Sequence, residues 1–288
     1  MNSEIKDKIY KLAIFLIIIS AVFLSFRFAK NKKQDVAAPK SNESIENIQA
    51  APTISSFISE SNDESEKIIP SAAPIFMYHY IRKYSDLNDP IGENLSVSPE
   101  KFEEHLAWLK GNNYQTIFPD FFKNPEAISF RPIILTFDDG YQDAYDAAFP
   151  ILRKYQMAGM FYLIVNKIGT PGYLTWDEIV EMQKAGMSFG SHTLTHPDLR
   201  KLSSVNLEKQ IKESKVVLEQ KLGRAITDFC YPSGKYDDAA LKELQADNYQ
   251  TAVTTSSGIS SLKDNPFLLK RRRITGSTKI KNILISNQ

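Results

Sequence analysis

Two short motifs place carboxylate and imidazole side chains where they could bind a metal ion. Asp138 and Asp139 are adjacent in the segment TFDDG, and His192 and His196 are four residues apart in HTLTH. Two carboxylates at the end of a buried strand are costly unless a cation compensates their charge. Two histidines at this spacing can converge on one ion, and with one carboxylate they form a common catalytic zinc site.

Each motif taken alone also has an ordinary structural explanation. Asp-Gly is a frequent turn pair, and an isolated pair of histidines can lie on a surface or in a core. Both motifs, however, follow apolar segments of one domain, and together they use half of the four histidines in the chain. The combination therefore favours a single hydrolytic metal site.

The composition narrows the possible ligands and partners. Cys230 is the only cysteine, so an intramolecular disulfide and a thiolate-rich zinc site are excluded, and a metal must rest on histidine and carboxylate. The formal net charge of +1 gives no global basic field that would favour nucleic acid. With 288 residues, of which 42% are hydrophobic, the chain can form one large α/β domain with additional segments.

The elements that must position these residues are short apolar runs that alternate with helical patterns. Strands are expected at Pro74–His79, Pro132–Phe137, Gly159–Val165, Met187–Gly190, Ile226–Tyr231, Gln250–Thr254 and Leu268–Ile274. Helices are expected at Pro99–Lys110, Tyr141–Tyr155, Thr175–Gly186, Ser203–Leu222 and Asp237–Ala246. This β–α order predicts a parallel sheet, closed or nearly closed into a barrel, with catalytic groups at the carboxyl ends of its strands.

The first part of the chain differs from the rest. Leu12–Phe26 contains no charge, and with its flanks it supplies roughly the 20 apolar residues that a bilayer needs. We expect residues 1–33 to be an uncleaved transmembrane anchor, with a cleaved signal peptide as the alternative. Residues 34–72 are predicted to be a flexible, disordered linker. Residues 73–288 then form the catalytic domain, which substrate considerations place outside the cell membrane.

The motifs resemble those of the polysaccharide deacetylases of the NodB-homology superfamily, also called carbohydrate esterase family 4. The resemblance covers roughly residues 73–280, and TFDDG and HTLTH carry it most specifically. It implies a distorted (β/α) barrel of the NodB type. It also implies that Asp138 is the general base and that Asp139, His192 and His196 bind the metal.

The resemblance also implies groups that bind the substrate. In the family, a backbone amide of a third motif stabilises the oxyanion, and the matching segment CYPSG gives this role to the amide of Ser233. Tyr231 and Trp176 are expected to contact sugar rings, as is Tyr141, because sugars stack on aromatic faces. Ordinary core packing is the alternative for each aromatic residue.

One standard arginine of the family is missing. Cys230 stands where an arginine usually holds the base, and a thiol cannot orient a carboxylate as a guanidinium does. The run Arg271-Arg272-Arg273 offers a substitute, and Arg271 and Arg273 share one face of the expected strand. We expect Arg273 to hold Asp138, with a solvated basic edge as the alternative for the whole run.

The histidine that usually supplies the catalytic acid is missing as well. No histidine follows His196, although the leaving amine must be protonated. His79 lies at the end of the first expected strand, in a Tyr-His pair that resembles the branch containing poly-N-acetylglucosamine deacetylases. We expect His79 to be the general acid, and a packed strand-end histidine is the alternative.

The sequence thus predicts a metal-dependent hydrolase that removes N-acetyl groups from a polymer containing N-acetylglucosamine. Poly-N-acetylglucosamine, peptidoglycan and a chitin-like glycan are the substrates considered. Zinc is the expected ion, and Co²⁺, Ni²⁺ or Mn²⁺ could also serve such a site. The alternatives are an O-deacetylase that acts on a polysaccharide such as acetylated xylan, and a non-catalytic carbohydrate-binding relative.

Overall fold

The computed structural model describes residues 67–285, with the exception of residue 87. Every described residue belongs to one compact unit of the chain, Asp63–Gln288. The predicted anchor at residues 1–33 and most of the predicted linker therefore lie outside the described residues. Within the described ranges, no helix has the length and apolar character that a membrane span requires.

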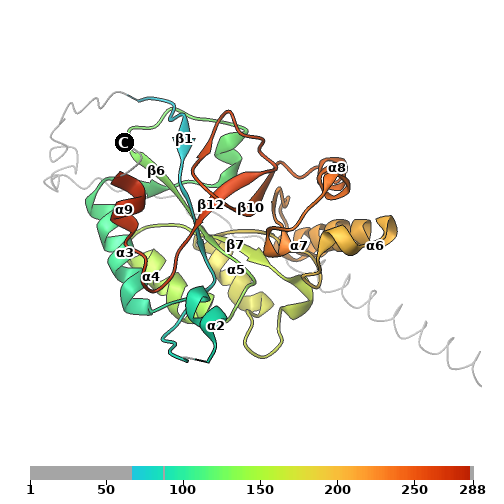
Figure 1. Ribbon diagram of the computed structural model, residues 1–288, viewed down its shortest axis with the longest axis horizontal. Coiled ribbons are helices and arrows are strands. Elements are labelled where there is room, and N and C mark those ends of the chain that lie inside the picture. Colours follow the sequence, from blue (N-terminus) through green and yellow to red (C-terminus); the bar gives the residue numbers. More distant parts are fainter. Residues whose placement is uncertain (1–66, 87, 286–288) are drawn as a thin grey trace, which may run out of the picture. The chain divides into compact units, whose positions relative to one another are not determined.

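Seven parallel strands close into a barrel, as the sequence predicts (Figure 1). Their order around the barrel is β2 (Ile75–Tyr78), β12 (Leu269–Arg273), β10 (Thr251–Ser257), β9 (Asp228–Cys230), β8 (Ser188–Ser191), β7 (Met160–Leu163) and β6 (Arg131–Phe137). The pairing of β6 with β2 closes the ring. Because β12 lies between β2 and β10, the last strand of the domain adjoins the first.

Short strands flank this ring. β5 (Tyr114–Thr116) pairs with the first residues of β6. β3 (Tyr80–Ile81) pairs with β4 (Ser96–Val97), and β1 (Ala72–Ala73) pairs with β11 (Ser260–Ser261). β3 begins two residues after β2 ends, so it carries the chain away from the carboxyl end of the barrel.

Helices cover the outside of the barrel. In Figure 1, α3 (Pro99–Gly111), α4 (Phe149–Lys154) and α9 (Ile280–Ile285) lie on one side, and α6 (Ser204–Glu208), α7 (Ser214–Leu222) and α8 (Asp238–Ala246) lie on the other. The remaining helices and helical turns are α2 (Pro90–Leu95), α5 (Trp176–Lys184), η2 (Pro119–Phe122), η4 (Val165–Lys167), η5 (Leu199–Lys201) and η7 (Pro232–Gly234).

The local signals for helix starts are confirmed, but two helices are less regular than predicted. The capping box of Thr175 and Glu178 opens α5, and the Ser98 side chain caps α3. The helix predicted to begin at Tyr141 begins instead with a π-helical turn, η3 (Ala144–Ala148). Pro150 follows this turn, and it has no amide hydrogen for the regular α-helical bond. A second π-helical turn, η6 (Lys209–Glu213), separates α6 from α7.

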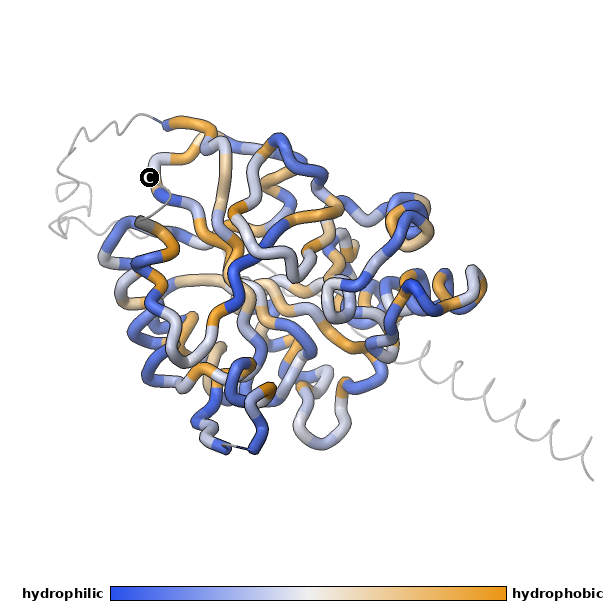
Figure 2. Tube along the Cα trace, in the orientation of Figure 1, coloured by the Kyte–Doolittle hydropathy of each residue, from blue (hydrophilic) through white to orange (hydrophobic). Residues whose placement is uncertain are grey.

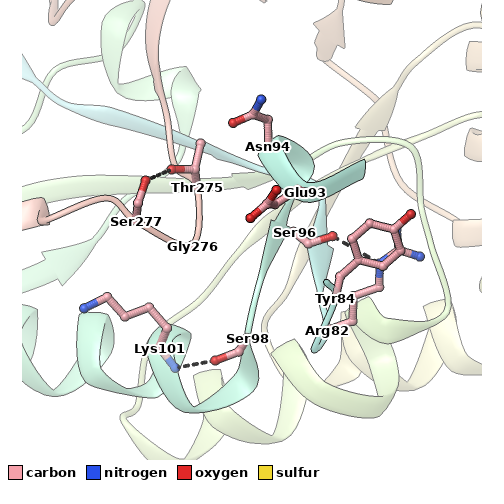
Figure 3. A pocket seen from close by; sticks show the side chains of 10 residues that line it. All are labelled: Arg82, Tyr84, Glu93, Asn94, Ser96, Ser98, Lys101, Thr275, Gly276 and Ser277. Atoms are coloured by element: carbon pink, nitrogen blue, oxygen red, sulfur yellow. Dashed lines mark hydrogen bonds between the residues drawn. The ribbon is translucent and has the colours of Figure 1, made fainter. Parts of the chain in front are cut away.

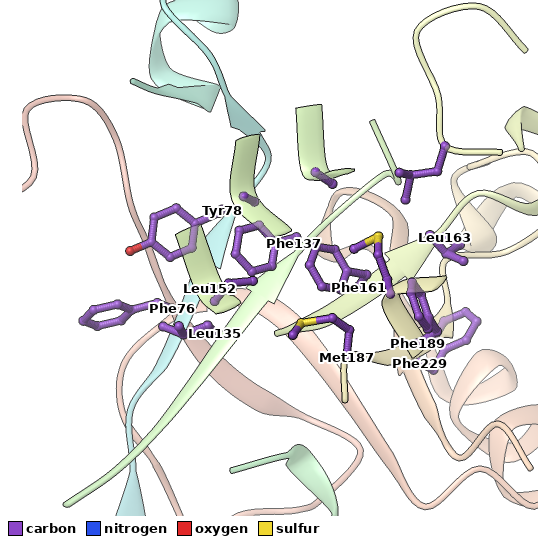
Figure 4. Close-up of a cluster of buried hydrophobic side chains, with 14 of the residues drawn as sticks. Phe76, Tyr78, Leu135, Phe137, Leu152, Phe161, Leu163, Met187, Phe189 and Phe229 are labelled. Carbon is purple, nitrogen blue, oxygen red and sulfur yellow. The ribbon is translucent and has the colours of Figure 1, made fainter. Parts of the chain in front are cut away.

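Alternating side chains of the strands form two separate cores. Ile134 of β6 points into the barrel, where it joins Ile75, Met160, Val253 and Leu269. The neighbouring β6 residues Ile133, Leu135 and Phe137 point outward and pack under the helices. There the rings of Phe137 and Phe161 stack 4.6 Å apart (Figure 4). Figure 2 shows the same distribution, with hydrophobic strands at the centre and mixed polarity along the outer helices.

Gly190 of β8 provides a test of how tightly the barrel holds the segment before His192. A Cβ at this position would lie 2.6 Å from the backbone oxygen of Asp228 and 2.8 Å from the ring of Tyr162. Gly190→Ala should therefore lower the free energy of unfolding by about 1–3 kcal/mol, measured by urea unfolding. Gly111→Ala is the matched control, because a Cβ there meets nothing within 4 Å. Equal effects of the two substitutions would contradict this account of the packing.

Candidate active site

The candidate functional side chains gather at the carboxyl ends of the barrel strands, as predicted. Asp138 and Asp139 follow β6, His192 follows β8, and His79 follows β2. His196 comes from the loop after β8. The parallel barrel alone brings these residues together, because the carboxyl ends of its strands all lie at one rim.

Asp139, His192 and His196 form a compact cluster of potential metal ligands. Oδ1 of Asp139 lies 3.4 Å from Nε2 of His192 and 3.7 Å from Nε2 of His196. Metal–ligand bonds of about 2.1 Å that meet at tetrahedral angles put ligand atoms about 3.4 Å apart. The three side chains therefore fit a zinc-sized ion and leave a fourth position free for water or substrate.

Hydrogen bonds and backbone geometry hold the two histidines in this arrangement. Nδ1 of His192 lies 2.7 Å from the carbonyl oxygen of Cys230, so it donates there and leaves the lone pair of Nε2 for a metal. The amide of His196 donates to Oγ1 of Thr193 at 2.9 Å. Asp139, Thr193 and His196 all have positive φ angles, of 75°, 70° and 60°. Such conformations are uncommon for residues other than glycine, and they recur at binding sites.

Asp138 is held by Arg271. Its Oδ1 and Oδ2 each accept a hydrogen bond of 2.7 Å from the guanidinium group. Arg271 is itself 1% exposed, and it also donates to Oγ1 of Thr136 and to the carbonyl oxygen of Thr254, both at 2.9 Å. Planar guanidinium groups suit this two-bond contact with a carboxylate, which fixes the direction of its lone pairs.

The prediction that Arg273 holds Asp138 is therefore wrong. Arg271 and Arg273 do share a face of β12, but they lie about 6.6 Å apart along the strand, so only one can reach a given carboxylate. Asp138 is 3% exposed and points into the barrel, where Arg271 also lies, whereas Arg273 is exposed at the strand end. Burial is the main cause of the lowered pKa of His79, and the positive charge of Arg273 adds to this effect.

The ion pair determines the protonation state of Asp138. Burial alone would raise the pKa of this carboxyl group, but the charge and hydrogen bonds of Arg271 outweigh burial and hold the pKa well below its usual range. Asp138 is therefore a carboxylate at any pH near neutrality. It is always in the form that accepts a proton, although its basicity is low.

Cys230 fills the space beside this pair without carrying charge. Its thiol lies 3.6 Å from Oδ2 of Asp138, and the guanidinium of Arg271 donates to its sulfur at 3.3 Å. Burial raises the pKa of the thiol. A second possible ligand group, Asp138 with His192 and Cys230, is therefore less suited to a metal, because Arg271 already occupies the carboxylate and the thiol stays protonated.

His79 lies beside Asp138, as its predicted role requires. Its Nε2 is 3.9 Å from Oδ2 of Asp138, and its side chain keeps 13% exposure. Burial lowers the pKa of His79, and the carboxylates of Asp138 and Asp139 only partly oppose this effect. The imidazole is therefore neutral near pH 7 before any substrate binds.

Ser233 is exposed at the rim, whereas the two predicted sugar-stacking residues lie elsewhere. Ser233 and Gly234 have consecutive positive φ angles of 53° and 71°, which form a sharp turn after β9. Tyr231 is fully buried in the outer core, where its ring contacts Phe229 and Tyr236. Its hydroxyl has no hydrogen-bond partner among the described residues. A fully buried ring cannot stack on a sugar, so the prediction for Tyr231 is wrong.

Trp176 likewise packs outside the barrel. It begins α5 and is partly buried against the outer core. The ammonium of Lys221, near the end of α7, lies 5.6 Å from the centre of its ring. The ring is only partly buried, so the substrate contact of Trp176 stays a prediction. For Tyr231, core packing explains the aromatic residue.

The structure also shows an aromatic cluster of which only one member, Tyr141, was predicted from the sequence. The rings of Tyr80 and Tyr141 stack 3.8 Å apart, and Tyr173 lies 5.2 Å from Tyr141. The charge of Asp139 helps to raise the pKa of each of the three hydroxyls, beyond the larger effect of burial. Tyr80 directly follows His79, and Tyr141 follows the TFDDG motif, so proximity in sequence was the available signal. Nothing in the sequence pointed to Tyr173.

The two arginines differ in how much the fold should depend on them. Arg271→Met would leave the Asp138 carboxylate buried without its partner, and it should lower the free energy of unfolding by about 3–5 kcal/mol. Arg273→Met should change it by less than about 0.5 kcal/mol, because that side chain is exposed. Urea unfolding of the metal-free protein measures both values. A larger loss for Arg273→Met would show that the assignment to Arg271 is incorrect.

Comparisons with known proteins agree with this geometry. Residues 127–252 match the family described as polysaccharide deacetylase. The Bacillus subtilis protein YxkH, named as a polysaccharide deacetylase, is 33% identical over 210 residues, which cover 72% of each chain. The poly-β-1,6-N-acetyl-D-glucosamine N-deacetylase of Staphylococcus epidermidis is 29% identical over 234 residues, covering 71% of this chain and 80% of that one.

A solved structure extends the likeness over the whole described domain. The Streptococcus pyogenes deacetylase PplD, determined in complex with acetate, is 33% identical and superposes with a TM-score of 0.71, covering 76% of this chain and 99% of that one. Fold, motifs and relatives therefore agree. The chain belongs to the polysaccharide deacetylase family, and it is a hydrolase of the class that acts on carbon–nitrogen bonds other than peptide bonds.

Proposed function

We propose that the chain uses a divalent metal, with zinc as the default, to remove N-acetyl groups from a β-linked polymer of N-acetylglucosamine. The observation that carries the proposal is the cluster of Asp139, His192 and His196 beside an Asp138 that Arg271 holds in place. The Staphylococcus epidermidis relative, which is named for this activity, supports the choice of substrate. Acetate, the product of deacetylation, is bound in the structure of PplD.

Asp139, His192 and His196 would hold the metal. When bound, the metal supplies Lewis acidity, which polarises the acetyl carbonyl and makes a bound water more acidic. The protein must also keep the two imidazoles neutral, since a protonated imidazole cannot bind a metal. The hydrogen bond from Nδ1 of His192 to the carbonyl of Cys230 fixes the tautomer in which Nε2 is free.

Asp138 would act as the general base. Arg271 binds both of its carboxylate oxygens, so the carboxylate keeps a fixed orientation, and a free lone pair of Oδ2 accepts the proton of the attacking water. The low pKa ensures that the group is always ionised. The proton it receives is weakly held and is readily given up to a neighbouring base.

His79 would be that neighbouring base and then the general acid. Its imidazole is neutral in the free site, because burial lowers its pKa. Nε2 lies 3.9 Å from Oδ2 of Asp138, a gap that a small side-chain rotation closes. The protonated imidazole then donates to the nitrogen of the leaving amine, which cannot depart as an anion. The exposed turn at Ser233 would supply a backbone amide to the oxyanion.

Ester hydrolysis on the same site is the second candidate function. An ester leaves as an alkoxide that needs less assistance from an acid than an amine does, so an O-deacetylase depends less on His79. The position of His79 beside Asp138 favours amide hydrolysis. The assembled base, acid and ligand cluster also argues against a purely carbohydrate-binding role.

The location of the enzyme follows from the sequence rather than from the described residues. We propose that residues 1–33 anchor the chain in the cell membrane by a single span, or direct its secretion if they are cleaved. The catalytic domain would lie on the extracytoplasmic side, joined by the linker at residues 34–72. A flexible tether of this composition would let an anchored enzyme reach a polymer at the cell surface.

Zinc binding tests the ligand cluster directly. His196→Ala should weaken zinc binding by more than about 100-fold, beyond the loss typical of changes to groups that only support ligands. His105→Gln is the matched control, because His105 bonds to Tyr78 and Thr278 outside the cluster. Isothermal titration calorimetry measures both affinities. An unchanged zinc affinity in His196→Ala would refute the assignment of His196 as a metal ligand. Removal of the metal by a chelator should also abolish acetate release, and added zinc should restore it.

Acetate release from defined substrates tests the reaction. Asp138→Asn and His79→Gln should each lower kcat by about 10²- to 10⁴-fold on N-acetylglucosamine oligomers. Zinc affinity of Asp138→Asn serves as the control for an intact site. Equal activity of Asp138→Asn and the wild type would rule out Asp138 as the base. Activity on acetylxylan alone would indicate an O-deacetylase, and sugar binding without acetate release would indicate a non-catalytic relative.

A further inference from the structure

A polar pocket is lined in part by the residues that follow β2 and β12, the two strands that carry His79 and Arg271. It has a volume of about 510 Å³ and lies between the start of α3, the helix α2 and the loop that follows β12 (Figure 3). The reaction proposed above uses none of its lining residues. Its size is in the range of pockets that bind small ligands.

The chain connects this pocket closely to the catalytic groups. Arg82 of the pocket is three residues beyond His79, so their Cα atoms are at most about 11 Å apart. Thr275, on the opposite wall, is two residues beyond Arg273. The pocket is thus lined by the direct continuations of the two strands that carry His79 and Arg271. A sugar chain bound at the active site and extending past the ends of β2 and β12 would therefore run toward this pocket.

Arg82 is held rigidly at the side of the pocket. Its guanidinium lies 3.5 Å from the ring centre of Tyr80 and 4.4 Å from that of Tyr84, and its Nε donates to Oγ of Ser96 at 3.1 Å. Tyr80 in turn stacks on Tyr141 of the aromatic cluster. A guanidinium fixed in this way loses little conformational entropy when it donates to a ligand.

The rest of the lining suits the hydroxyl and amide groups of an uncharged sugar. The lining mixes hydrogen-bond donors and acceptors, since it offers hydroxyls, one carboxamide, one carboxylate and an ammonium group. The residues that carry these groups are Glu93, Asn94, Ser98, Lys101, Thr275 and Ser277. Lys101 is already paired with Glu104 at 2.8 Å, and Glu93 opposes the charge of Arg82. The pocket therefore has no strong field of one sign that would select an anion or a cation.

We infer that this pocket is a second saccharide subsite, which binds a neutral N-acetylated sugar unit of the same polymer near the unit being deacetylated. The inference rests on the proposed function, because it assumes that the substrate is a chain of sugars. Its consequence is a preference for longer oligomers. A single sugar reaches the metal cluster only, whereas an oligomer also binds beside Arg82 and Asn94.

Asn94→Trp in the full-length protein tests the inference, because Asn94 is exposed on the pocket wall and a bulky ring would fill the space. We compare kcat/KM for the N-acetylglucosamine tetramer with that for the monomer. The ratio of the two values should fall on the order of tenfold, mainly through KM for the tetramer, which is the effect of losing about two hydrogen bonds. Asn206→Trp, an equally exposed asparagine on α6, is the matched control and should leave the ratio unchanged.

An unchanged ratio in Asn94→Trp would overturn the inference, whether kcat/KM is retained for both substrates or lost equally for both. Tetramer binding to His79→Gln, measured by calorimetry, is a second measurement that does not depend on turnover and that leaves the Asp138–Arg271 pair intact. If the wild type releases no acetate but Asn94→Trp still weakens tetramer binding in the His79→Gln background, the subsite stands and the proposed reaction fails. If tetramer binding is unaffected by Asn94→Trp, the subsite fails.

Discussion

The buried ion pair between Asp138 and Arg271 is the interaction on which the site depends. Both side chains are almost fully buried, and Arg271 donates two hydrogen bonds of 2.7 Å to Asp138 inside a barrel lined mainly by apolar residues. Neither charge could remain there without the other, because an isolated charge in such an interior costs several kcal/mol. The pair therefore fixes the orientation of the proposed base Asp138, keeps it ionised, and holds the end of β12 in place.

The topology of the barrel makes this pair possible. β12 enters between β2 and β10, so the last strand of the domain lies beside the first, and each carries one group that the active site needs. His79 comes from the end of β2 and Arg271 from within β12, 192 positions later in the chain. Cys230 then needs only to fill space beside the guanidinium, which explains how an uncharged thiol can stand at this position.

The sequence predicted a residue's role well where that role depends on the residue's position along a strand. It predicted the role less well where this depends on how deep the side chain lies in the barrel or on whether it points toward the site or the outer core. The ends of apolar runs located Asp138, Asp139, His192 and His79 at one rim, because parallel strands share their carboxyl end. Because side chains alternate between the two faces of a strand, the arginine that holds Asp138 could be Arg271 or Arg273. Alternation does not tell which of the two lies deeper in the barrel. The prediction for Tyr231 is wrong for a related reason: this residue adjoins a functional motif, yet its ring is fully buried in the outer core.

The same constraint explains the protonation states that the mechanism requires. Arg271 keeps Asp138 ionised, and burial beside two arginines keeps His79 neutral, so the free site holds a weak base next to a neutral imidazole. In the proposed reaction, a proton that Asp138 took from water would have a stronger acceptor in His79, whose Nε2 lies 3.9 Å from Oδ2 of Asp138. An arginine at position 230 and a histidine on a late strand are therefore not required for this chemistry. What is required is a guanidinium deep in the barrel and an imidazole at its rim, whichever strands supply them.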